Sequence, residues 1–200
     1  MSRLAARFGR QLAHPHGLSG RLLAVAMRFA NRRAMRQSIA ALDIRVGEDI
    51  LDLGCGAGDA LPALARRSET GRIFGIDHSP TMSALARRRC PAATVMEAPF
   101  DRLPLPDASV DRVLAVNVAY FWRKDGAVVR ELNRVLRPGG RLVVYVTDAS
   151  ALAKVGLDRA GTHRLFDLAD LQMMLGATAS IMPVRAGPAV QGWLAVVIRP

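Results

Sequence analysis

The sequence predicts an α/β fold in which a doubly wound, mostly parallel sheet of seven strands carries helices on both faces. Short apolar runs typical of buried strands alternate with segments of helical periodicity, and this order produces parallel strands joined by crossover helices. Near the C-terminus the order changes, because two strand-like runs at 181–185 and 193–198 are separated by a link too short for a crossover helix. We therefore expect an antiparallel hairpin at the end of the sheet.

The strands expected before this hairpin are short apolar runs. The first ends in a cluster of glycines, and the last is rich in β-branched residues, which favour strands. The expected ranges are 49–53, 72–76, 93–96, 110–116 and 141–146.

The helices between these strands have recognisable boundaries. Asp59 is a possible N-cap for the helix after the first strand, and Ser79 followed by Pro80 is a favourable start for the next helix. The clearest helix has its apolar residues on one stripe across 128–136. The Pro-Gly-Gly sequence at 138–140 should stop it.

The N-terminal segment differs from the rest of the chain in charge. The length is that of one ordinary domain, whose main body we place at 46–200. Residues 1–45 hold nine arginines and one acidic residue, within a chain of net charge +11. An amphipathic pattern over 17–42 predicts helices. The arginines indicate peripheral contact with an anionic membrane or substrate, or only a solvated helix face.

Composition narrows the classes of protein. No apolar run reaches the roughly 18 residues of a membrane span, and the N-terminus does not have the pattern of a secretory signal. Cys55 and Cys90 are too few for a disulfide framework or a metal cluster. We therefore expect a cytoplasmic protein without a metal site.

A glycine-rich loop follows the first expected strand. Gly54, Gly56 and Gly58 stand at alternate positions after Asp52, where a buried strand gives way to a helix. Glycine lets the backbone turn sharply and lets a ligand touch the main chain. In open α/β sheets, ligands bind in the crevice at this end of the strands. A turn with spare glycines is the simpler alternative.

Asp77 ends the second strand, where a carboxylate can accept hydrogen bonds from both hydroxyls of a ribose. A dinucleotide site would also place an acid here, but two features disfavour it. Asp59 stands where the dinucleotide fingerprint needs glycine or alanine, and its charge would face a pyrophosphate. The C-terminal hairpin also replaces the second mononucleotide-binding half.

In order and spacing, five segments resemble the class I S-adenosylmethionine-dependent methyltransferase family. The resemblance covers about residues 47–147 and is nearest to the small-molecule branch that includes ubiquinone- and menaquinone-biosynthesis enzymes. It implies a Rossmann-like fold and S-adenosyl-L-methionine as cofactor, with S-adenosyl-L-homocysteine as product. It also implies that the N-terminal helical segment, 17–42, folds over the active site as a lid. The matching segments are the glycine loop at 52–58, then 75–82, Glu97-Ala98, 103–111 and 134–142.

The resemblance also implies a role for individual residues. Gly54, Cys55 and Gly56 would lie against the methionine part of the cofactor, with Asp52 bracing their loop. Asp77 would bind the ribose hydroxyls. The remaining cofactor contacts would be His78, Met82, Glu97 and Ala98 around the adenine, with Ala98 acting through its backbone N–H, and Asn117 and Val118 at the methionine end.

The acceptor is expected to be a small or lipid-like molecule that attacks the methyl group in line. Tyr120, Phe121 and Trp122 follow the fourth strand and are expected to line an apolar acceptor pocket or, alternatively, to form a core wedge. A general base is optional in this chemistry. Candidates are Tyr120 and His163, although a lone histidine is more often a surface residue.

Two other functions stay open. A nucleic-acid methyltransferase is less favoured, because Asn117-Val118-Ala119-Tyr120 stands where amino-group methylation of nucleic acids uses an Asn/Asp-Pro-Pro-aromatic motif. A non-catalytic binding module that keeps the fold is the other alternative. The sequence leaves the acceptor and the oligomeric state open.

Overall fold

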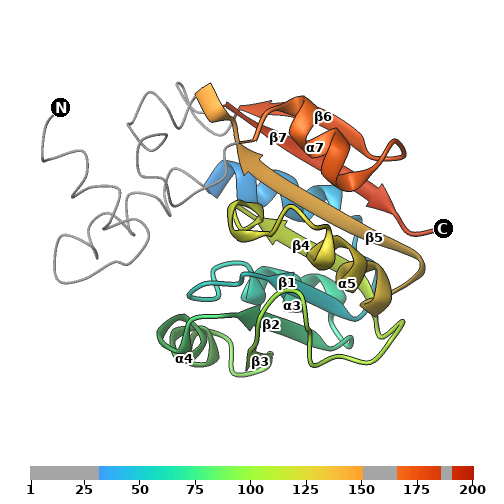
Figure 1. Ribbon diagram of the computed structural model, residues 1–200. Helices are drawn as coiled ribbons and strands as arrows, with labels where there is room; N and C mark the ends of the chain where they lie inside the picture. Colours follow the sequence, from blue (N-terminus) through green and yellow to red (C-terminus); the bar gives the residue numbers. More distant parts are fainter. Residues whose placement is uncertain (1–31, 151–165, 186–190) are drawn as a thin grey trace, which may run out of the picture.

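The computed structural model describes residues 32–150, 166–185 and 191–200, and these form one seven-stranded sheet (Figure 1). The strand order is β3-β2-β1-β4-β5-β7-β6. The first five strands are parallel, whereas β7 is antiparallel to both β5 and β6. This confirms the predicted doubly wound sheet with its C-terminal hairpin. The strands are β1 (Ile50–Leu53), β2 (Ile73–Asp77), β3 (Thr94–Glu97), β4 (Val110–Val116), β5 (Leu136–Thr147), β6 (Ser180–Arg185) and β7 (Gln191–Ile198).

Helices cover both faces of the sheet, and each face has its own buried cluster. A helix at 32–41 and α3 lie on one side, and α5 and α7 lie on the other (Figure 1). The helices described are 32–41, α3 (Leu61–Ser68), α4 (Pro80–Arg89), α5 (Ala127–Val135) and α7 (Leu168–Leu175), with the 3₁₀ turn η1 (Ala119–Phe121) after β4.

Local sequence explains two of these helices. Ser79 caps α4 by accepting a hydrogen bond from the Met82 N–H, with Pro80 in the first turn, as the sequence predicts. In α5 the apolar stripe faces inward and buries Val128 and Leu132. Local sequence therefore determines where α4 begins and which face of α5 is buried.

Two predicted boundaries are wrong. Asp59 does not cap α3, because this helix begins after Ala60 without a side-chain cap. The carboxylate of Asp59 pairs instead with Arg89 on α4. The helix before β5 ends at Val135, so the Pro-Gly-Gly sequence lies inside the strand rather than between helix and strand. Backbone hydrogen bonds between 139–140 and Arg199 extend the sheet there.

The helix at 32–41 is part of the core. Ala34, Ile39 and Leu42 are buried in the same cluster as Leu114 of β4 and Tyr145 of β5. Residues 1–31, which include most of the lid expected at 17–42, lie outside the described residues. None of the helices in the described ranges has the length and apolar character that a membrane crossing requires.

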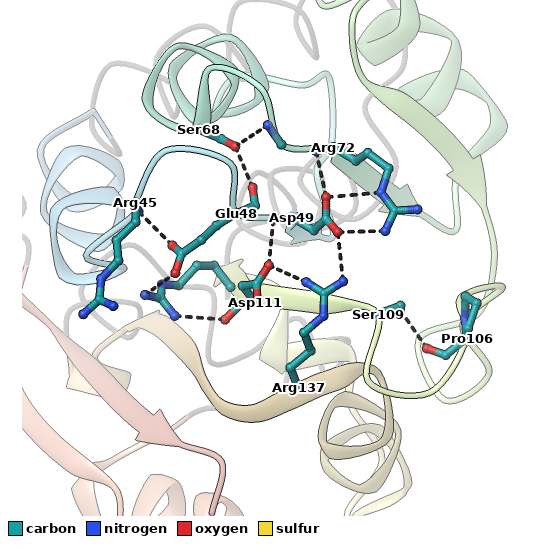
Figure 2. A network of polar contacts seen from close by, with 11 residues as sticks. Arg45, Glu48, Asp49, Ser68, Arg72, Pro106, Ser109, Asp111 and Arg137 are labelled. Atoms are coloured by element: carbon teal, nitrogen blue, oxygen red, sulfur yellow. Dashed lines mark hydrogen bonds and ion pairs between the residues drawn. The ribbon is translucent and has the colours of Figure 1, made fainter.

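An ion-pair network joins the amino ends of the central strands (Figure 2). The Asp49 carboxylate accepts hydrogen bonds from Arg72 and, at 3.0 Å, from Arg137. Arg137 also pairs with Asp111, whose carboxylate accepts the Asp49 N–H at 2.9 Å. The hydrogen bond from Arg72 lowers the pKa of Asp49 to about 2. The network lies at the edge of the sheet opposite the glycine loop and fixes the strands that present it.

Candidate functional site

The glycine loop stands at the carboxyl end of β1, the strand between β2 and β4. Gly54, Gly56 and Gly58 all have φ in the left-handed region, at +69°, +53° and +79°. A Cβ on Gly54 would lie 2.3 Å from Cγ2 of Val118, so the loop packs directly on the segment after β4. A Cβ on Gly58 would meet the Ala86 backbone at 3.0 Å. These two glycines are required by packing as well as by conformation.

Gly56 differs from its neighbours because its outer face is open. A Cβ built on it would have no described atom within 4 Å. Its N–H donates at 2.9 Å to Oδ2 of Asp77, which is buried at the end of β2, and Oδ1 of Asp77 accepts the Ser79 N–H at 2.9 Å. The structure therefore brings the predicted loop and the predicted ribose-binding acid into contact beside an open main-chain surface.

Asp52 lies behind this loop and is almost fully buried. Burial, assisted by the nearby charge of Asp77, raises its pKa to about 8. Within the described ranges no hydrogen bond to its carboxylate is found. Burial also raises the pKa of the Cys55 thiol, whose sulfur lies beside Gly75. A thiol in that environment is an inert packing group rather than a nucleophile.

The expected adenine side holds three aromatic rings. His78 is exposed, and its ring centroid lies 5.5 Å from that of Phe100 and 5.9 Å from that of Phe121. Met82 is half-buried in the first turn of α4. Phe100 was missed in the sequence, although it stands only two residues after Ala98.

Glu97 and Ala98 lie at the end of β3, where this strand stops pairing with β2. Glu97 is exposed at the end of β3, and the Ala98 N–H donates at 3.2 Å to the carbonyl of Asp77. The expectation that this N–H faces an adenine edge is therefore corrected, because the sheet already uses it. The side chain of Glu97 remains available for that edge.

Asn117 joins the ends of β4 and β5. Its backbone is left-handed, with φ +54°, and its Oδ1 accepts hydrogen bonds from the Tyr120 hydroxyl at 2.9 Å and from the N–H and hydroxyl of Thr147, each at 3.2 Å. Thr147 was missed in the sequence, although it ends a strand at the same edge. Three donors on one oxygen fix the orientation of the Asn117 amide.

The structure corrects the role expected for Tyr120 as a base. Its side chain is buried, its hydroxyl accepts the Thr147 N–H at 2.6 Å, and burial raises its pKa. A group with a raised pKa rarely loses its proton near neutrality. The other candidate base, His163, lies outside the described residues.

The aromatic residues after β4 divide into two kinds. Trp122 is 3% exposed and packs in the core cluster with Leu132, whereas Phe121 is 46% exposed. The ring of Phe121 points to His78 rather than into that core. The described ranges contain no group of three or more His, Cys, Asp or Glu side chains that could hold a metal ion.

Residues 51–144 match the family model for the methyltransferase domain. The chain belongs to the class I S-adenosylmethionine-dependent methyltransferase family. The resemblance found in the sequence is thereby confirmed, and S-adenosyl-L-methionine is the cofactor of this family.

Relatives of known name agree with this family. The chain is 35% identical to demethylmenaquinone methyltransferase of Thermus thermophilus, over 67% of this chain and 61% of the relative. It is 36% identical to trans-aconitate 2-methyltransferase of an Azoarcus species, over 60% of this chain and 48% of the relative. The chain thus spans less than two thirds of the length of either relative.

Solved structures show the same fold. An S-adenosylmethionine-dependent methyltransferase from Aquifex aeolicus superposes with a TM-score of 0.69 at 19% identity, and the match covers 96% of this chain and 98% of that one. Geranyl diphosphate C-methyltransferase of Streptomyces coelicolor gives a TM-score of 0.70 at 13% identity, over 84% of this chain and 75% of that one. At these identities the likeness concerns the fold.

Proposed function

We propose that this protein transfers a methyl group from S-adenosyl-L-methionine to a small-molecule or lipid-like acceptor. One observation carries the proposal: the open face of Gly56 lies beside the buried carboxylate of Asp77, to which the Gly56 N–H is hydrogen-bonded. A cofactor with a ribose and a flexible amino-acid arm fits this pairing. The Asp77 carboxylate can accept hydrogen bonds from the ribose hydroxyls, while the arm lies along the open main chain at Gly56.

Each neighbouring residue then has a defined task. Asp77 holds the ribose, and Gly54 and Gly56 support the methionine arm. Asp52 places a buried carboxyl group behind the loop. The other contacts proposed are Cys55 through its backbone, His78, Met82 and Glu97 at the adenosine side, and Asn117 and Val118 at the methionine side.

The bound cofactor supplies an activated methyl group on a sulfonium, so the chain has to position the reactants and exclude water. Asn117, fixed by Tyr120 and Thr147, holds the β4 edge of the site rigid. Trp122 fills the core beneath that edge and supports the place where the acceptor would meet the methyl group. No base is assigned among the described residues, because burial raises the pKa of Tyr120.

The acceptor class rests on the relatives, whose names describe small molecules: a demethylmenaquinone and trans-aconitate. The arginine-rich segment 1–45 would suit peripheral contact with an anionic membrane or substrate. We also assign the protein to the cytoplasm, a reducing compartment that suits two buried, unpaired cysteines, Cys55 and Cys90.

The test is a transfer assay with tritiated S-adenosyl-L-methionine. A reduced demethylmenaquinone, trans-aconitate and a mixed tRNA fraction would be offered separately, and S-adenosyl-L-homocysteine release measured. The proposal expects turnover on a small molecule that Asp77→Ala abolishes. Transfer to tRNA alone, or release that is equal in Asp77→Ala, would contradict it.

A further inference from the structure

The two faces of the sheet carry helices of different charge. The helix at 32–41, α3 and α4 contribute to one buried cluster, so they cover the same face. The helix at 32–41 holds three arginines, α3 holds two and α4 holds three, and none of these helices holds an acidic residue. On the other face, α5 holds two arginines and a glutamate, and α7 holds one acid and no basic residue. We call the surface formed by the helix at 32–41, α3 and α4 the basic face.

Three arginines of the basic face point away from the sheet. Arg36, Arg66 and Arg88 each stand two positions after a buried residue, which is about 200° around an α-helix. All three are exposed, and the structure gives none of them an ion pair within the described residues. Arg134 on α5 differs, because it pairs with Glu131 at 2.7 Å. The charge of the basic face is therefore directed to solvent.

Helix stability does not account for this distribution of charge. The dipole of a helix favours cations in the last turn and acids in the first turn. It explains the positions of Arg66 and Arg88, which lie in last turns, but the first turns of α3 and α4 hold no acid. Arg36 lies in the middle of its helix, where the dipole gives a cation no stabilisation. An anionic partner outside the domain would supply the missing counter-charge.

The other side chains of the basic face favour a membrane over a nucleic acid. Proteins that bind single-stranded nucleic acids combine cations with aromatic rings that stack on the bases. The residues described in the helix at 32–41, α3 and α4 include no aromatic side chain. Leu85 on α4 is instead 43% exposed, one turn before Arg88. Surface helices that bind anionic lipids combine an apolar group of this kind with basic residues.

We propose that the basic face docks on a membrane that contains anionic lipids. Its arginines lie against the lipid phosphates, and Leu85 enters the boundary between headgroups and acyl chains. Each arginine close to an anionic membrane strengthens binding by about fivefold. This surface belongs to the folded domain and adds α3 and α4 to the contact proposed for segment 1–45. Its binding to a membrane does not depend on methyl transfer.

Co-sedimentation of the full chain with lipid vesicles tests the proposal. Vesicles of equal parts phosphatidylcholine and phosphatidylglycerol should bind the protein, and vesicles of phosphatidylcholine alone should not. Added salt should weaken the binding, because it screens exposed charges. Arg66→Gln combined with Arg88→Gln leaves segment 1–45 unchanged and should lower partitioning to the anionic vesicles at least tenfold.

Arg102→Gln combined with Arg130→Gln is the matched control, because it removes the same charge from exposed positions on or beside α5. The control should bind the anionic vesicles like the wild type, and both variants should keep the wild-type melting temperature and affinity for S-adenosyl-L-homocysteine. Failure of the wild type to bind anionic vesicles, or an equal loss in the two variants, would overturn the proposal. Unchanged partitioning of the Arg66→Gln and Arg88→Gln variant would also overturn it. Tighter binding of mixed tRNA than of vesicles, weakened by the same variant, would assign the basic face to a nucleic acid instead.

Discussion

The hydroxyl of Tyr120 donates a hydrogen bond of 2.9 Å to Oδ1 of Asn117. Asn117 has a left-handed backbone, with φ +54°, a conformation that costs a residue other than glycine roughly 1 kcal/mol. Strained backbone of this kind persists where surrounding contacts hold it, and here it lies at the edge of the candidate site. Tyr120 is thus a positioning residue.

Tyr120→Phe should destabilise the fold by about 1–2 kcal/mol, because the Thr147 N–H and Asn117 Oδ1 each lose their shortest hydrogen bond. Denaturant unfolding would measure the loss. Tyr145→Phe is the control, since the Tyr145 hydroxyl is buried without a hydrogen-bond partner among the described residues, and its removal should cost little. A wild-type rate that rises with pH, and that becomes independent of pH in Tyr120→Phe, would show instead that Tyr120 acts as a base.

Gly54→Ala and Gly56→Ala should separate folding from binding. The first places a methyl 2.3 Å from Val118 Cγ2 and 2.7 Å from its Cβ, so we expect a loss of about 2–4 kcal/mol of stability. The second has no steric conflict and only a left-handed φ, which costs about 1 kcal/mol, yet its methyl enters the open face of the loop. Gly56→Ala should therefore fold but lose S-adenosyl-L-homocysteine binding at least tenfold; equal binding would argue against a ligand on this face.

Asp52→Asn should stabilise the protein in a pH-dependent way. The carboxyl has a pKa of 3.8 when unfolded and about 8 when folded, so its cost to the native state grows as the pH rises from about 4 to about 8. Thermal unfolding should show that the free energy of unfolding of the variant exceeds that of the wild type by an amount that grows from pH 4 to pH 8. At pH 8 the difference should be on the order of 1–4 kcal/mol. The exposed Asp101, replaced by Asn, should show no such trend. A constant difference from pH 4 to 9 would refute the raised pKa.

Asp49→Asn should have the opposite pH dependence. The folded pKa of Asp49 is about 2, below its ordinary 3.8. The carboxylate therefore makes its full contribution to the free energy of unfolding above pH 4, and this contribution disappears as the pH falls toward 2. At pH 7 the variant should lose about 1–3 kcal/mol, and its stability should converge with the wild type near pH 2. Asp107→Asn, at an exposed ion pair, should have little effect at any pH.

Signals confined to one segment were readable in the sequence. The strands fall within a few residues of the expected ranges, except that β5 begins earlier, and Ser79 caps α4, because apolar runs and caps act within one element. The glycine loop and Asp77 were predictable for a similar reason, since both end strands at the same edge. Their contact follows from the parallel order of β1 and β2.

The errors and omissions come from partners distant in the chain. Asp59 pairs with Arg89. β5 starts early because Leu136 pairs with Val110 of β4 and because Gly139 and Gly140 bond to the backbone of Arg199. Thr147 reaches Asn117 only through the neighbouring positions of β4 and β5, and Phe121 reaches His78 across β1. None of these contacts leaves a periodic pattern in the sequence.

The central claim is that the glycine loop and Asp77 hold S-adenosyl-L-methionine. The most direct measurement is calorimetric titration of the full chain with S-adenosyl-L-homocysteine, with NAD as the control ligand and Asp77→Ala as the control protein. We expect micromolar binding of S-adenosyl-L-homocysteine, no binding of NAD, and loss of binding in Asp77→Ala. A folded wild type that fails to bind S-adenosyl-L-homocysteine, or that binds NAD instead, would contradict it.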